Sequence, residues 1–166
     1  MFKEMKISRL ILDPVTNTPI IILKDLEDEL TLPIWIGLLE ASAIALELEK
    51  ESPQRPMTHD LIKNILISLK THVVKVELTD LRESTFYALI YLKMEGKTFT
   101  IDARPSDAIA IALRTSAPIY VDEKVIRKLT KANLESITDI DKVDETAKLQ
   151  DLLEEMSPED FGKYKM

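Results

Sequence analysis

Apolar residues recur along this chain with two periods, one typical of strands and one typical of helices. Runs rich in apolar and β-branched residues at 5–12, 19–23 and 30–36, separated by polar turns, predict a three-stranded antiparallel meander. Similar runs at 73–79, 85–92 and 97–101 predict three more strands, the last two joined as a hairpin around Glu95 and Gly96. Residues 86–92 are apolar on both faces, which indicates a central strand.

Helical periodicity occupies the segments between and after these runs. Residues 38–49 contain so many apolar positions, largely Ala, that the helix predicted there must be mostly buried. From residue 58 the apolar side chains fall on one face of a second helix, and residues 105–114 predict a short buried one. A strand at 118–121 and a basic helical segment at 124–131 follow. Strands punctuated by helices, without regular β-α-β alternation, predict an α+β fold with a mixed, largely antiparallel sheet and Ala-rich buried helices.

The length of 166 residues, of which 45% are hydrophobic, suits one main domain with a substantial core. We place this domain at 1–132, and an acidic linker with a C-terminal helical tail at 133–166. The tail's amphipathic helix needs the domain or a second subunit to dock on, because its apolar residues share one face: Leu149, Leu152, Leu153 and Met156. The charged start MFKEMKI, and the absence of a window of about 18 apolar residues, predict a cytoplasmic protein that does not enter membranes.

The formal net charge of −7 is confined to the tail. Between Asp139 and Asp160 the chain has nine acidic and two basic residues, so the remaining 20 basic and 20 acidic residues leave the rest neutral. A neutral domain neither requires nor excludes a phosphate-bearing ligand. Because there is no cysteine, any chemistry has to come from carboxylates, His, hydroxyls, Lys or Arg.

Acidic residues open two similar Ala-rich segments, Glu40-Ala-Ser-Ala-Ile-Ala-Leu and Asp107-Ala-Ile-Ala-Ile-Ala-Leu. The Ala side chains allow close packing, and the helix dipole favours a carboxylate near a helix N-terminus. Pro105 suits the first helical position, which makes Asp107 a third-position acid able to accept hydrogen bonds from free backbone N–H groups. Asp102, Arg104 and Asp107 thus concentrate three charges at one strand-to-helix turn. Such a turn can bind an anion or a metal, but an Asp–Arg pair that only stabilises the turn leaves the same pattern.

The segment from Arg55 to Asp60 is the second concentration of polar residues. Thr58 suits an N-cap and Asp60 the first helical turn, both ordinary choices at a helix start. His59 is less ordinary, because a protonated imidazole is disfavoured at the positive end of a helix and the neutral ring can bind a metal or accept a proton. A lone His is also frequently structural, and both interpretations stay open.

Phosphodiester cleavage requires a metal ion or a base-and-acid pair, together with cations that neutralise the phosphate. The predicted catalytic residues are Asp102, Asp107, Glu40 and His59. A divalent metal such as Mg²⁺ or Mn²⁺ is predicted on Asp102, Asp107 and Asp60. The predicted substrate-binding residues are Arg55, Arg104, Arg114, Thr58 and Ser106. The last two hydroxyls lack the base and third residue that a serine triad needs.

A resemblance to the bifunctional nuclease domain family is carried by four segments: LPIWIGLLEASAIALELE, RPMTHDLI, TFYALIYL and IDARPSDAIAIALRTSAPIYV. It covers most of residues 5–125. It implies an α+β domain with a mixed sheet, often dimeric, and for plant members an activity on both RNA and DNA. All the site residues named above except Arg114 match positions of the family's motifs.

Two functions follow. The first is a nuclease that cleaves RNA or DNA with a divalent metal. The second is a non-catalytic dimeric module that recognises an anionic ligand or a partner protein through the polar turn. The neutral domain and the lack of a basic patch studded with aromatic residues favour the second, and the clustered polar residues and the resemblance favour the first. In both, a homodimer or a higher homo-oligomer is expected.

Overall fold

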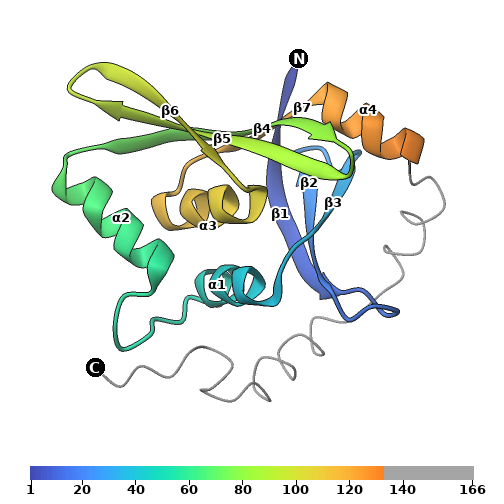
Figure 1. Cartoon of the computed structure of the whole chain (residues 1–166), viewed down its shortest axis with the longest axis horizontal. Coiled ribbons are helices and arrows are strands. Elements are labelled where there is room, and N and C mark those ends of the chain that lie inside the picture. The colour runs from blue at the N-terminus through green and yellow to red at the C-terminus, as the bar shows by residue number, and fades with distance from the viewer. Residues whose placement is uncertain (133–166) are drawn as a thin grey trace.

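The architecture is a bent seven-stranded sheet with helices packed inside the bend (Figure 1). It is known from a computed structural model, which describes residues 1–132. The strands are β1 (Phe2–Leu12), β2 (Pro19–Asp25), β3 (Thr31–Trp35), β4 (His72–Arg82), β5 (Thr85–Met94), β6 (Lys97–Ala103) and β7 (Ile119–Asp122). The helices are α1 (Leu38–Leu48), α2 (Thr58–Ser68), α3 (Pro105–Thr115) and α4 (Glu123–Ala132). The predicted tail and its helix lie outside the described residues.

The sheet order is β3-β2-β1-β7-β4-β5-β6. Among the strands of the described residues, only β4 and β7 pair in parallel, and every other pairing is antiparallel. The predicted meander at the start of the chain and the hairpin around Gly96 are both confirmed, as is the internal position of β5 between β4 and β6. The short strand β7 joins the two halves of the sheet, so the predicted α+β class with a mixed, largely antiparallel sheet is confirmed.

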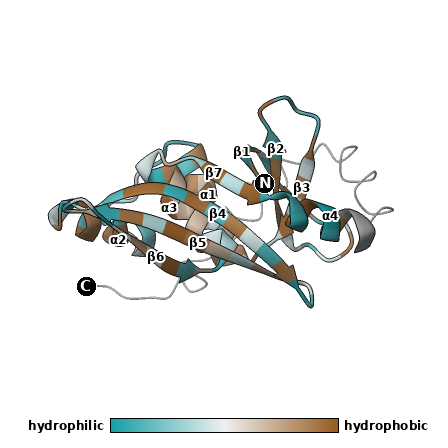
Figure 2. Cartoon of the chain, turned by 90° about the horizontal axis from the view of Figure 1, so that it is seen from above, coloured by the Kyte–Doolittle hydropathy of each residue, from teal (hydrophilic) through white to brown (hydrophobic). Residues whose placement is uncertain are grey.

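The core lies between one face of this sheet and the Ala-rich helices α1 and α3. Ala41, Ala45, Ala108 and Ala112 are buried where α1 and α3 pack against each other and the sheet. Small side chains permit this close approach, which explains the predicted burial of both helices. Figure 2 looks onto the opposite face of the sheet. Hydrophilic and hydrophobic residues alternate along β4, as expected for a strand buried on one side, whereas β5 carries the continuous apolar run 88–90.

Helix α2 differs from the other two helices of the bend. It packs against α3, but none of its residues is buried. Leu61 and Ile65 are 53% and 48% exposed, so the apolar face that predicted the helix is turned largely to solvent. Its start also differs from the prediction: the N-cap is Met57 rather than Thr58, because the Asp60 carboxylate accepts the Met57 backbone N–H at 2.9 Å.

Within residues 1–132, no helix combines the length and the apolar composition that crossing a lipid bilayer demands.

Candidate functional site

The turn between β6 and α3 places Arg104 beside Asp107. Arg104 is the N-cap of α3 and is held extended (φ −68°, ψ 146°), as the following proline requires. Its Nε donates to Asp107 Oδ2 at 2.7 Å, and its Nη2 donates to Asp107 Oδ1 at 3.2 Å. Asp107 is therefore the predicted third-position acid, but it accepts hydrogen bonds from a guanidinium rather than from the helix backbone.

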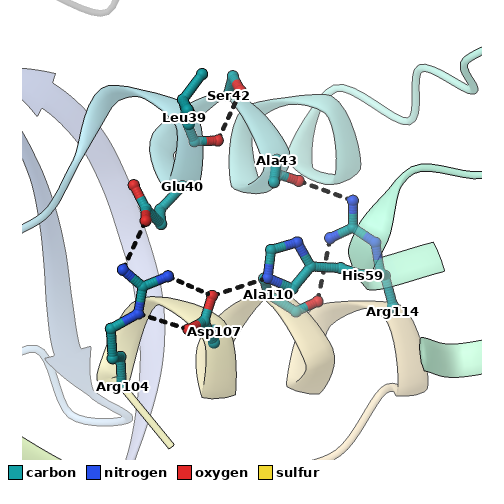
Figure 3. Close-up of polar contacts among 9 residues, drawn as sticks. All are labelled: Leu39, Glu40, Ser42, Ala43, His59, Arg104, Asp107, Ala110 and Arg114. Carbon is teal, nitrogen blue, oxygen red and sulfur yellow. Dashed lines mark hydrogen bonds and ion pairs between the residues drawn. The ribbon is translucent and has the colours of Figure 1, made fainter. Parts of the chain in front are cut away.

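Arg104 also connects the two Ala-rich helices at their N-terminal ends. Its Nη1 lies 2.8 Å from Glu40 Oε1, so the acids that open the two similar segments share one cation (Figure 3). Gly37, the N-cap of α1, makes room for this arrangement, since a Cβ there would clash with the Glu40 carboxylate. The similarity of the two segments thus corresponds to one shared ion-pair system.

His59 completes the arrangement from a third helix, α2. Its Nε2 lies 3.0 Å from Asp107 Oδ1, and its side chain is 12% exposed. Figure 3 shows the imidazole and the guanidinium approaching the Asp107 carboxylate from opposite sides. We call Glu40, His59, Arg104 and Asp107 the polar cluster. Three helices that are distant in sequence meet at it.

The charges in the polar cluster stabilise one another. Burial alone would raise the pKa of the Asp107 carboxyl, but the hydrogen bonds from Arg104 and His59 outweigh it and bring this pKa below its usual 3.8. The same carboxylate, by hydrogen bonding and charge, raises the pKa of Arg104, and Glu40 adds to the effect. Asp107 is therefore ionised at neutral pH. An ionised carboxylate only accepts hydrogen bonds, so the proton shared with His59 belongs to Nε2.

A pocket of about 630 Å³ lies beside the polar cluster. One part of its wall is apolar and comes from α1, α2, β5, β6 and α3. The other part is polar and includes all four residues of the cluster and Thr58. An apolar cavity with a few converging polar groups is the usual form of a small-ligand or active site. The larger apolar side chains of this wall are Leu39, Met57, Ile62, Ile90, Ile101 and Ile111.

Asp102 borders the pocket but does not join the polar cluster. It pairs with Leu89 in the sheet, while Ile101 and Ala103 on either side of it pair with Ile90 and Ala88, which belong to the core. Because side chains alternate along a strand, the Asp102 carboxylate is directed to the face opposite α3. It makes no hydrogen bond or ion pair within residues 1–132. Its predicted part in the chemistry therefore lacks support from the geometry.

Arg114 is buried and bound by three helices, so it is not a free cation. Its side chain is 3% exposed, and its Nε donates to Asp60 Oδ1 at 2.6 Å. Nη2 and Nη1 donate to the carbonyl oxygens of Ala43, at 2.9 Å, and Ala110, at 3.1 Å, as Figure 3 shows. The residue thus ties α1 and α2 to α3, which leaves no part of it for the predicted contact with substrate.

Asp60 is the ion-pair partner of Arg114. Burial alone would raise its pKa, but the Arg114 guanidinium and the Met57 N–H stabilise the carboxylate and hold the pKa below 3.8.

The two remaining substrate-binding candidates do not line the pocket. Arg55 is exposed in the loop before α2, without an ion pair to any residue of the described range. Ser106 is buried in the first turn of α3 and is not part of the pocket wall. Of the five predicted substrate-binding residues, the pocket brings together Arg104 and Thr58.

The residues predicted to hold a divalent metal do not form a ligand set. Asp60 is bound by Arg114, Asp102 is directed to the other face of the sheet, and Asp107 is shared by Arg104 and His59. Across residues 1–132, no three His, Asp or Glu side chains lie close enough together to hold a metal ion. A Mg²⁺ or Mn²⁺ site needs several oxygen ligands converging on one point. Asp60, Asp102 and Asp107 do not converge, so they do not fit such a site.

Sequence reasoning missed two features of the site. One is Gly37, whose missing side chain leaves room for the Glu40 carboxylate. The other is the apolar wall, although its α2 residues belong to the pattern that predicted the helix. Nothing in that pattern indicated that the face would remain open, because periodicity reports which residues share a side and not what covers that side.

Known proteins resemble this chain over most of its length. The sequence model of the Bifunctional nuclease domain family matches residues 21–133. The uncharacterised protein Rv1829 of Mycobacterium tuberculosis is 38% identical over 163 residues, which cover 95% of this chain and 97% of that protein. Bifunctional nuclease 1 of Arabidopsis thaliana is 31% identical over 110 residues, covering 63% of this chain and 34% of the plant protein.

A further plant protein, Bifunctional nuclease 1 of Oryza sativa subsp. japonica, is 30% identical over 100 residues, covering 58% of this chain and 30% of the rice protein. The family match spans β2 to α4 and contains the whole polar cluster. The chain belongs to the bifunctional nuclease domain family.

Proposed function

We propose that this chain cleaves phosphodiester bonds of nucleic acid at the polar cluster. The observation that carries the proposal is the pair formed by His59 and Asp107 at the wall of the pocket, next to the exposed Arg104 guanidinium. An imidazole oriented by a carboxylate is a common general base. A guanidinium is suited to a phosphate, because its N–H groups match the phosphate oxygens.

Each residue of the cluster has a role in this proposal. His59 accepts the proton of the attacking hydroxyl, and Asp107 holds the imidazole in one tautomer and orientation. Arg104 binds a non-bridging phosphate oxygen and offsets the charge that develops there. Glu40 does not contact the substrate; it positions Arg104 through the ion pair at 2.8 Å. The family name and the names of the plant relatives support nucleic acid as the substrate.

The proposal is tested by incubating the purified chain with fluorescein-labelled single-stranded RNA and DNA oligonucleotides. Cleavage is expected, and its rate should follow the protein peak through a second, unrelated chromatography column. If the activity separates from the protein, the proposal fails. In that case, a rise in melting temperature with nucleotides or inorganic phosphate would favour the alternative, a binding module for an anionic ligand.

We further propose that the chain forms a homodimer through the exposed face of α2. Leu61, Ile62, Ile65 and Leu69 are all more than a third exposed. These side chains lie on one face of α2, and an exposed apolar face of this kind typically marks a site of association.

The dimer prediction can be checked by light scattering after size-exclusion chromatography. The wild-type chain is expected at twice its mass of 18.9 kDa, and Ile65→Lys at the mass of a monomer, because a buried lysine opposes association. Val15→Lys is the control, since Val15 is exposed in the turn between β1 and β2. A monomeric wild type, or a dimer unchanged in Ile65→Lys, contradicts an interface at α2.

A further inference from the structure

We infer that the substrate of the polar cluster is single-stranded RNA, cut without a metal ion by attack of the substrate's own 2′-hydroxyl. This rests on the proposed cleavage function and narrows it to one class of nucleic acid. It is narrower than the activity on both RNA and DNA that the resemblance implies for plant members.

The available metal ligands favour RNA over DNA. DNA has no hydroxyl next to the phosphate, so its cleavage commonly relies on metal-activated water. In the part of the chain that is described, no three carboxylate or imidazole side chains converge. The two carboxylates of the polar cluster already share Arg104, at 2.8 and 2.7 Å, so a cation would have to displace that guanidinium. RNA supplies its nucleophile internally, and its cleavage needs only a base and a phosphate-binding group.

His59 has one ring nitrogen free to act as a base. The ionised Asp107 accepts the Nε2 proton, which leaves the lone pair on Nδ1. Nδ1 has no hydrogen-bond partner among residues 1–132, although the ring contributes to the pocket wall. A ring held at one nitrogen by a carboxylate and open at the other can accept a proton from a bound hydroxyl.

The chemical step balances with these groups and water. The 2′-hydroxyl gives its proton to His59 Nδ1, and the 2′-oxygen forms a bond to phosphorus. The bond between phosphorus and the 5′-oxygen breaks, and the leaving oxygen takes a proton from water at the open side of the site, where Arg104 is 65% exposed. The products are a 2′,3′-cyclic phosphate and a free 5′-hydroxyl, with no change of oxidation state. His59 then returns its proton to water.

The apolar wall indicates a single strand. A pocket of about 630 Å³ has room for a nucleobase, and Met57, Ile62 and Ile101 offer apolar surface beside the polar cluster. A base within a duplex is stacked and paired, so it has to leave the helix before entering such a pocket. A single strand avoids most of this cost.

The inference is tested with a fluorescein-labelled DNA oligonucleotide that contains one ribonucleotide. Two matched substrates differ only at that position, one with deoxyribose and one with a 2′-O-methyl ribose. In the presence of EDTA, cleavage is expected only on the 3′ side of the ribonucleotide, and mass spectrometry should find a 2′,3′-cyclic phosphate. Both matched substrates should be cut at least about 100-fold more slowly, because they lack the hydroxyl that His59 deprotonates.

Several outcomes overturn the inference and leave the proposed cleavage function standing. They are equal cleavage of the all-DNA substrate, loss of cleavage in EDTA, or products that end in a 3′-hydroxyl and a 5′-phosphate. If no substrate is cleaved, with or without added Mg²⁺, the proposed function itself fails. A preparation of His59→Ala made in parallel excludes a contaminating ribonuclease; equal cleavage by that preparation also overturns the inference.

Discussion

Replacing Arg114 with alanine is expected to lower the free energy of unfolding by about 3 kcal/mol. The side chain is 3% exposed and links three helices, through Asp60 in α2, the Ala43 carbonyl in α1 and the Ala110 carbonyl in α3. Its removal leaves the Asp60 carboxylate without a cation and the Ala43 carbonyl without its donor. Losing one partner of a buried ion pair typically costs about 3–5 kcal/mol, and partial exposure of Asp60 places this case at the lower end.

Urea denaturation followed by circular dichroism measures this effect. Arg127→Ala is the matched control, because Arg127 is 73% exposed and its ion pair with Glu123 lies on the surface of α4; about 0.5 kcal/mol or less is expected there. Arg114→Lys should fall between the two, since it keeps the charge but not the three directed hydrogen bonds. An Arg114→Ala variant within about 1 kcal/mol of wild type would show that α1 and α2 are not held by this residue.

The gap in free energy of unfolding between wild type and Arg114→Ala should also depend on pH. The pKa of Asp60 lies below 3.8 in the folded chain, so its ion pair contributes stability that is fully present above the unfolded value. That contribution is lost as the pH falls through the folded pKa, and the gap should narrow there. A gap that stays constant down to about pH 2 would mean that the carboxylate is not what Arg114 stabilises.

Replacing His59 with alanine is expected to lower kcat/KM for oligonucleotide cleavage by about 10²–10⁴-fold. The variant removes the proposed base but leaves Asp107 bound to Arg104, so the loss of stability should be only about 1 kcal/mol. His72→Ala is the matched control, because His72 is exposed at the start of β4 and does not line the pocket. Its kcat/KM should equal that of wild type.

Initial rates on a fluorogenic oligonucleotide, with circular dichroism as a check of folding, decide this prediction. A folded His59→Ala with undiminished kcat/KM would remove the imidazole from the mechanism. Asp107→Asn provides an independent variant, since the amide cannot hold the charged guanidinium and the Nε2 proton in the same way. A loss of kcat/KM in both His59→Ala and Asp107→Asn, and not in His72→Ala, supports the conclusion that His59 and Asp107 act together.

Local periodicity was enough to predict most of the fold. The meander, the hairpin at Gly96 and the helix after Pro105 depend on turn residues and on the spacing of apolar side chains, which act over a few positions. The nearness of Arg104 to Asp107 could be predicted for the same reason, because they are three positions apart in one turn. The opposite orientation of Asp102 follows from the alternation of side chains along β6, since its neighbours Ile101 and Ala103 pair with the core residues Ile90 and Ala88.

Local periodicity could not predict which distant residues pair. Glu40 and Arg104, His59 and Asp107, and Asp60 and Arg114 are each separated by about 50 residues or more. A carboxylate at a helix N-terminus looks the same whether it caps a backbone, binds a guanidinium or holds a metal. Asp107 and Asp60 therefore matched several roles at once until the contacts of α1, α2 and α3 were known.

By itself, the sequence determined the α+β class, the burial of the Ala-rich helices and the position of the charged turn, because these follow from composition and spacing within single elements. Only the tertiary structure decided which charges meet, that Arg114 supports three helices, and that His59 rather than Asp102 joins Asp107. The physical reason is that an ion pair depends on distances of about 3 Å, and those distances are set by how helices pack and not by the order of residues along the chain.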